Sequence, residues 1–225
     1  MRLNPRNVKA WYRAASACLA LDKVDEAIDA CKSGLKFDAK NTALSTLLAK
    51  SQKRRDYLAQ LEASRKEREE RQRAEKASLR QALKARNIGT RQTDRPPEMP
   101  DASISLAEPL EPGSTLSFPV MLLYPLHAQT DFIKEFTEDS SLGEHLQYTL
   151  LLPWDEKGEY GLESVECYME TAEGGLIKAG KKLSLLKLLG SGKMEVVDGL
   201  VKVNIVPKAR AQEWIGDFKK RRGKA

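Results

Sequence analysis

Lys9 and Arg13 are the two residues whose type and spacing point most directly to binding chemistry. They lie four residues apart in a stretch whose apolar positions repeat with a helical period, so both cations project from one helix face. A guanidinium offers a planar fork of donors, whereas an ammonium is a compact point charge. Two cations of this kind suit a ligand rich in carboxylates, such as an acidic peptide.

The other candidate motifs argue against an enzyme, a cofactor or a metal. His127 and His145 are the only histidines, and neither lies in a nucleophile motif. The segment 175–182 resembles a P-loop but has Lys182 where Ser or Thr is needed, so we interpret it as a turn beside a strand. An acidic stretch contains Asp131, Glu135, Glu138 and Asp139. It lacks the glycine and terminal Glu of a calcium loop, and we predict a solvated face.

The composition predicts globular pieces joined by solvated ones. The chain has 225 residues, of which 31% are charged and 41% hydrophobic, and its formal net charge is +6. No apolar run is long enough to cross a bilayer, and the first 22 residues lack the order of a signal peptide. We therefore expect a cytosolic or nuclear protein without a membrane partner. Three widely spaced cysteines, Cys18, Cys31 and Cys167, are expected to be reduced thiols.

One charged window predicts a long helix. Between Lys53 and Arg86 there are twelve basic and six acidic residues, so this window alone accounts for the net charge of +6. It contains no Pro or Gly, and strong helix formers fill it. We expect a helix from near Thr42 to before Gly89, about 65–70 Å long at 1.5 Å per residue. Its apolar residues are too scattered for a coiled coil, which favours a solvent-bridging helix.

The first forty residues predict a helical hairpin that resembles a tetratricopeptide repeat. Two amphipathic periods flank a polar turn at 22–25. Seven positions match the repeat pattern: Trp11, Ala14, Ala15, Cys18, Ala27, Cys31 and Gly34. The complete repeat spans 8–41, and Leu3 to Asn7 resembles the end of a preceding one, with Pro5 at the position of its closing proline. Because one repeat cannot bury its own apolar faces, we expect that earlier repeats are missing from this chain.

The repeat resemblance gives Lys9 and Arg13 a role. In this architecture their face lines the concave groove. The pair is similar to part of the dicarboxylate clamp of co-chaperones that bind the Glu-Glu-Val-Asp end of the heat shock proteins of 70 and 90 kDa. The resemblance implies that the other clamp residues, a Lys and two Asn, belong to earlier repeats.

The last 110 residues predict a small α+β domain. We expect a buried strand over 116–124, a helix or helix-to-strand passage over 142–151, and a strand over 163–171. A turn at 174–175 leads into another strand, and 184–189 is either a helix or a strand. A hairpin over 194–206 and a last helix from Lys208 to about Arg221 follow. Four aromatic residues are expected in the core: Phe132, Phe136, Trp154 and Trp214.

The order of these parts resembles the tetratricopeptide-repeat protein 4 family of co-chaperones. The expected parts are the end of a repeat domain (1–52), a long charged helix (53–89), a Pro-rich linker (90–114) and an α+β domain (115–225). Three segments carry the resemblance in the second half: 118–125, 131–136 and 151–155. It implies a wheel-type last domain, action with heat shock protein 90 and also heat shock protein 70, and a client such as elongation factor 2.

An RNA- or ribosome-associated protein is the alternative. It would use the basic helix of 53–86 and the tail Lys219 to Arg222. Acidic residues are interleaved along that helix, and its sequence offers one aromatic residue, Tyr57, on which a base could stack, so we expect that nucleic acid is not the partner. RNA affinity that falls steeply with salt would favour this alternative.

Overall fold

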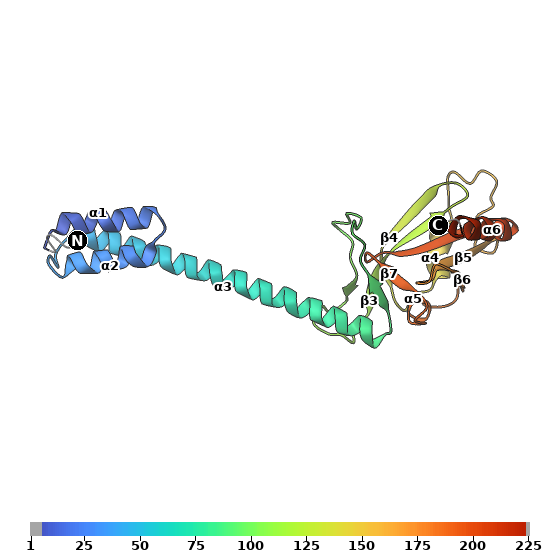
Figure 1. Cartoon of the computed structure of the whole chain (residues 1–225), viewed down its shortest axis with the longest axis horizontal. Coiled ribbons are helices and arrows are strands. Elements are labelled where there is room, and N and C mark those ends of the chain that lie inside the picture. Colours follow the sequence, from blue (N-terminus) through green and yellow to red (C-terminus); the bar gives the residue numbers. More distant parts are fainter. Residues whose placement is uncertain (1–5, 224–225) are drawn as a thin grey trace. The chain divides into compact units, whose positions relative to one another are not determined.

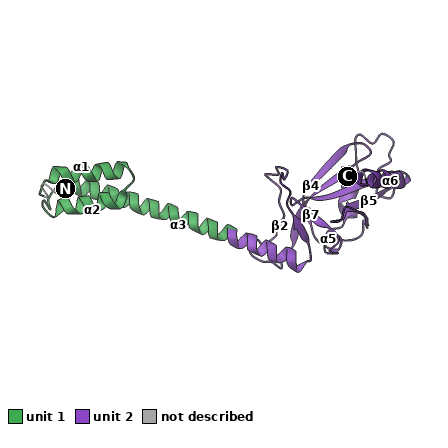
Figure 2. Cartoon of the chain, viewed as in Figure 1, with its two compact units in different colours: residues 1–72 green, residues 73–225 purple. Residues whose placement is uncertain are grey.

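The computed structural model describes residues 6–223, so the first part of the expected repeat end, Leu3 to Pro5 of Leu3 to Asn7, lies outside the described residues. The chain divides into two units, unit 1 (1–72) and unit 2 (73–225), as Figure 2 shows. The boundary falls inside one long helix, whereas we expected boundaries at the two ends of the charged segment, at 52 and 89.

Unit 1 begins with the predicted helical hairpin. Helix α1 (Val8–Ala20) and helix α2 (Val24–Leu35) pack side by side against the start of α3 (Thr42–Ala85), as Figure 1 shows. Asp22 takes a left-handed conformation in the turn, with φ 56°. The small core contains buried Ala15, Ala30, Cys31 and Leu44. The hairpin prediction is therefore confirmed.

Gly34 allows α1, α2 and α3 to approach closely. A Cβ atom at this position would lie 2.7 Å from Leu44 Cδ1 and 2.9 Å from Trp11 Cβ. Real Cβ atoms do not come so close to carbon atoms, so a side chain here would overpack the core. The glycine of the repeat pattern is thus needed for packing rather than for a turn.

Helix α3 confirms the predicted long charged helix. The Asn41 side chain caps its start by accepting a hydrogen bond from the Leu44 N–H at 3.0 Å. Every residue in 59–74 is exposed, as expected for a solvent-bridging segment. The helix ends at Ala85; Asn87, two residues later, has a left-handed φ of 55°, and the Ile88 N–H donates to the Leu83 carbonyl at 3.0 Å.

Unit 2 is built on a mixed six-stranded sheet. Its strands are β2 (Ser105–Leu106), β3 (Leu116–Tyr124), β4 (Gln129–Thr137), β5 (Val165–Glu170), β6 (Leu176–Ala179) and β8 (Val201–Pro207). The order β2-β3-β8-β5-β6 forms the main path, and β4 pairs with β3. Strands β3 and β8 are parallel, and every other pair is antiparallel. The expected α+β class is confirmed.

Helices cover both faces of this sheet. On one face, α4 (Leu142–Thr149), α5 (Leu185–Leu189) and the end of α3 contribute to the main core, with inward-facing residues such as Val120, Leu122 and Val203. On the other face, a 3-10 turn (Lys208–Arg210) leads into α6 (Ala211–Arg222), whose Trp214 packs with Tyr168 and Val206. The predicted last helix is thereby confirmed.

The predicted hairpin over 194–206 is wrong in its pairing. Its turn forms, with left-handed Asp198 and Gly199. However, β7 (Glu195–Val197) pairs in parallel with β1 (Gly89–Arg91) in a separate two-stranded sheet, and β8 pairs with β3 and β5. One isolated bridge, Val197 to Leu200, is all that joins the two arms in the described residues. The arms diverge because β8 is needed at the centre of the large sheet.

The segment 90–114 differs from the solvated linker that we expected. Strand β1 begins just before it, and β2 lies within it and pairs with β3. Leu106 is buried in the main core, and Ile104 packs against that core. Pro100, Pro109 and Pro112 lie in turns, so this segment is part of unit 2 rather than a free connection.

Strand β4 was not predicted, and its residues correct two interpretations. The acidic stretch does not form one solvated face, because Glu138 is only 5% exposed and Asp131 is half-buried. Among the aromatic residues expected in the core, Phe136 is buried but Phe132 is 47% exposed. Residues of β4 therefore face both the core and the solvent.

Candidate peptide-binding site

Lys9 and Arg13 lie on the exposed side of α1. The side chain of Asn7 caps the start of this helix, accepting a hydrogen bond from the Ala10 N–H at 3.1 Å. Val8, Trp11 and the neighbouring alanines pack toward α2 and α3, so the helical period turns Lys9 and Arg13 away from the core. Both side chains are exposed.

The charge of this pair is uncompensated nearby. Helix α1 contains no acidic residue, and within residues 6–223 neither Lys9 nor Arg13 forms an ion pair. Two cations one turn apart on a helix whose other face is anchored can therefore both contact an anionic ligand. Their role as carboxylate ligands stays a prediction.

Sequence reasoning missed the most strongly buried charges, Arg86 and Glu138. The Arg86 side chain is 15% exposed and that of Glu138 is 7% exposed. The guanidinium donates to both carboxylate oxygens, from Nε at 2.6 Å and from Nη2 at 2.8 Å. It also donates to the carbonyls of Pro112 at 2.9 Å and Ser114 at 2.7 Å. Glu138 in turn accepts from the Leu116 N–H at 3.0 Å.

This buried pair joins five segments of unit 2. Its side chains link the residue after α3, the turn at 112–114, the start of β3 and the end of β4. The fifth segment is α5, whose Leu186 N–H donates to the Glu138 carbonyl at 2.7 Å. The partners satisfy one another, and none of these groups is left to act on a substrate. The pair is therefore structural.

An aromatic cluster lies beside the end of β3. Tyr124 packs edge-on against Trp154 and Tyr160, with ring centroids 5.1 and 5.5 Å apart. The Tyr124 hydroxyl donates to Asp131 at 2.8 Å. Burial, and next this hydrogen bond, raise the pKa of Tyr124, while burial raises the pKa of Tyr160 to about 12. Both phenols stay protonated at neutral pH and pack rather than react.

His145 is a packing residue. Its ring stacks on Phe136 with a centroid distance of 3.9 Å. Burial lowers the pKa of His145 below its ordinary value of 6.5, against a smaller opposing effect of Glu144. The folded protein thus favours the neutral ring.

The free energy of unfolding is expected to depend on pH through His145. Because the pKa is lower in the folded state, the stabilisation is complete above the unfolded pKa of about 6.5, and it is lost as the pH falls below that value and through the lower folded pKa. Urea unfolding of the parent and of His145→Gln, measured from about pH 7 to about pH 5, should give a shallower loss of stability in the variant. Parallel curves would contradict this role.

The remaining reactive residues are held by the fold. Lys181, from the segment that resembles a P-loop, donates to the carbonyls of Leu162 and Val165, the latter at 3.2 Å. Burial raises the pKa of the Cys31 thiol and raises that of Cys167 to about 12.

Within residues 6–223, no group of three or more His, Cys, Asp or Glu side chains is arranged to hold a metal ion. No helix of the described chain is both long and apolar enough to cross a membrane.

A family model and several known proteins match this chain. The model, described as the Cns1/TTC4 Wheel domain, matches residues 108–218. The chain is 34% identical over 216 residues to the Hsp70/Hsp90 co-chaperone cns1 of Schizosaccharomyces pombe, covering 95% of this chain and 60% of that protein. It is 33% identical over 210 residues to human tetratricopeptide repeat protein 4, covering 84% of this chain and 53% of that protein.

A solved structure matches almost all of the chain. The Hsp90 co-chaperone Cns1 from Saccharomyces cerevisiae is 30% identical, with a TM-score of 0.88. The match covers 97% of this chain and 73% of that one. The chain spans about 60% of the length of the two fungal co-chaperones that it matches in sequence.

Proposed function

This chain belongs to the Cns1/TTC4 family of co-chaperones, and we propose that it works in the cytosol as an adaptor between a chaperone and a client. The expectation of a protein without enzymatic activity agrees with this family. In this proposal the repeat part binds the acidic C-terminus of heat shock protein 90, or of heat shock protein 70, while unit 2 supports client folding.

The exposed, uncompensated pair on α1 is the observation that supports the chaperone contact. A chain ending in Glu-Glu-Val-Asp presents side-chain carboxylates and a terminal carboxylate, which need cationic donors. Lys9 and Arg13 offer those donors from one helix face. By contrast, the basic helix suits RNA less well, since Arg65 pairs with Glu69 at 2.8 Å and Arg86 is buried against Glu138.

Calorimetric titration of the full-length protein with a peptide ending in Glu-Glu-Val-Asp tests this contact. Lys9→Ala and Arg13→Ala are each expected to weaken binding by about tenfold, because a hydrogen bond to a charged group contributes about 1.5–3 kcal/mol. Amidating the peptide's terminal carboxylate should also weaken binding. Lys32→Ala, which removes an exposed lysine of α2, should leave the affinity unchanged. Undiminished binding by the Lys9→Ala, Arg13→Ala double variant would exclude the clamp.

The client contact is a separate part of the proposal. The family resemblance suggests elongation factor 2, and the α+β fold of unit 2 offers surface for such a contact. Purified elongation factor 2 should bind the chain equally well when Lys9 and Arg13 are both replaced by Ala. Loss of client binding in that double variant would contradict the division of roles between the two units.

A further inference from the structure

Part of the large sheet in unit 2 presents an uncovered apolar face. Met121 of β3 is paired with Phe132 of β4, and Leu123 is paired with Thr130. These residues point away from the main core, because their neighbours Val120 and Leu122 point into it. Met121 and Leu123 are partly exposed, and Phe132 is 47% exposed. We call Met121, Leu123 and Phe132, together with Lys202 of β8, the open face.

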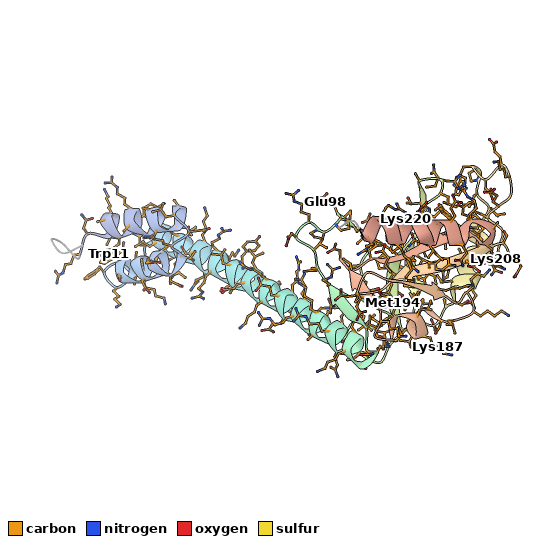
Figure 3. All side chains as sticks on the ribbon, turned by 45° about the vertical axis from the view of Figure 1, so that its right-hand side comes forward. Trp11, Glu98, Lys187, Met194, Lys208 and Lys220 are labelled. Atoms are coloured by element: carbon orange, nitrogen blue, oxygen red, sulfur yellow. The ribbon has the colours of Figure 1, made fainter. Side chains whose placement is uncertain are left out.

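Helix α6 covers only the adjoining part of the same side of the sheet. Its Trp214, Ile215 and Phe218 pack with Tyr168 of β5 and Val206 of β8. Figure 3 shows α6 lying along the sheet between the labelled Lys208 and Lys220. Beyond it, no helix of the described residues covers the outward side of β3 and β4, as the exposure of Phe132 shows.

The uncovered width fits one helix. Two neighbouring strands span about 10 Å, and an α-helix with its side chains is about 10 Å across. The flank of α6 already forms one wall, since Trp214, Asp217 and Arg221 line a depression together with Pro125 and Leu126. A second helix beside α6 would complete the layer over the sheet.

The charges around the open face favour an acidic ligand. On the flank of α6, Asp217 pairs with Lys220 at 3.6 Å and Glu213 pairs with Arg210 at 3.9 Å. Within residues 6–223, neither Lys202 nor Arg221 forms a close ion pair. Asp198 interacts electrostatically with Lys202 over a longer distance, but it also interacts with Arg91 and accepts two hydrogen bonds from Thr93. Lys134 and Glu135 are both exposed in the bulge of β4, and their opposite charges cancel in the net charge around the face. The surplus charge at the face is therefore positive.

We propose that the open face binds an amphipathic α-helix of a partner protein, whose apolar stripe is flanked by Asp and Glu. The apolar stripe covers Met121, Leu123 and Phe132, and the acidic flanks face Lys202 and Arg221. A peptide strand added to the edge of β4 would leave Met121 and Leu123 uncovered, so the helix is the better fit. The proposal stands independently of the chaperone contact at Lys9 and Arg13.

The test uses a designed, fluorescently labelled helical peptide of about 18 residues and the whole chain. The peptide carries Leu at helical spacing, Glu on both flanks and Ala elsewhere. Fluorescence anisotropy should show binding at least about tenfold tighter than for a matched peptide with Lys in place of Glu. Phe132→Asp should weaken binding about tenfold or more, and Lys202→Glu should weaken it severalfold.

Tyr148→Asp is the matched control. Tyr148 is 77% exposed and belongs to α4, which packs on the opposite face of the sheet, so this variant should bind the peptide like the parent. Circular dichroism should show that both Asp variants remain folded, because each replaces an exposed aromatic residue.

Three results would overturn the proposal. They are undetectable binding of the acidic peptide, equal binding of the acidic and basic peptides, and undiminished binding by Phe132→Asp. Sedimentation supplies a further check: a dimer of the parent chain that Phe132→Asp abolishes would assign the open face to a second copy instead.

Discussion

Replacing Glu138 by Gln is expected to lower the free energy of unfolding of unit 2 by about 3–5 kcal/mol. The amide keeps the shape of the carboxylate but removes its charge. Arg86 is then left 15% exposed, with its cation facing an amide and the backbone carbonyls of Ala82, Pro112 and Ser114. An unpaired buried cation is costly because water cannot solvate it, and the cost exceeds that of most single substitutions.

Hydrogen exchange of the amides in β3 and β8 measures this loss. These central strands exchange through global opening of the unit, so their protection reports its stability. Glu195→Gln is the matched control, because Glu195 pairs with Arg91 at 2.8 Å in the same unit but nearer to solvent. It should cost less than about 1 kcal/mol. Equal losses in the two variants would show that burial of the Arg86–Glu138 pair is unimportant.

Replacing Trp214 by Ala is expected to cost about 3–5 kcal/mol, with the loss concentrated on α6. The indole is 4% exposed and packs against Tyr168 and Phe218, with ring centroids 5.6 and 5.8 Å apart. This cluster is separate from the main core on the other face of the sheet. Helix α6 should therefore detach while the core stays folded.

The same hydrogen-exchange experiment distinguishes local from global loss. In Trp214→Ala the amides of α6 should exchange rapidly, whereas those of β3 should keep most of their protection. Phe132→Ala removes an exposed aromatic side chain of the open face and should leave the protection of the α6 amides and of the β3 amides unchanged. A uniform loss of protection across unit 2 would show that the two faces unfold as one.

Local signals predicted the helices well. The periods of α1 and α2, the helix formers of α3 and the buried run of β3 were all readable in the sequence. We left 142–151 open between a helix and a helix-to-strand passage. Yet Ser141 and Glu144 form a capping box, with the Ser141 N–H donating to Glu144 Oε2 at 2.6 Å, and that spacing favours a helix.

Long-range pairing explains what the sequence could not predict. The alternation of buried and exposed residues in β4 is interrupted at a bulge opposite Pro119, which has no N–H to donate to the neighbouring strand. Many residues of β4 are also polar and exposed, so its sequence lacks the apolar pattern of a strand. Arg86 and Glu138 are 52 residues apart, and nothing around either residue specifies the other. For the candidate site, one helical turn sufficed to bring Lys9 and Arg13 to one face, because that relation is local.

The parallel pairing of β3 with β8 sets the order in which unit 2 can fold. Val120 lies opposite Val201, so β3 must wait for a strand whose paired residue is synthesised 81 residues later. The β3–β4 hairpin can form early, because its loop is short, but closing the long loop to β8 costs more chain entropy. A ribosome-bound chain that ends before β8 therefore carries β3 with one edge unpaired. Unit 2 is therefore open to misassembly until β8 has left the ribosome.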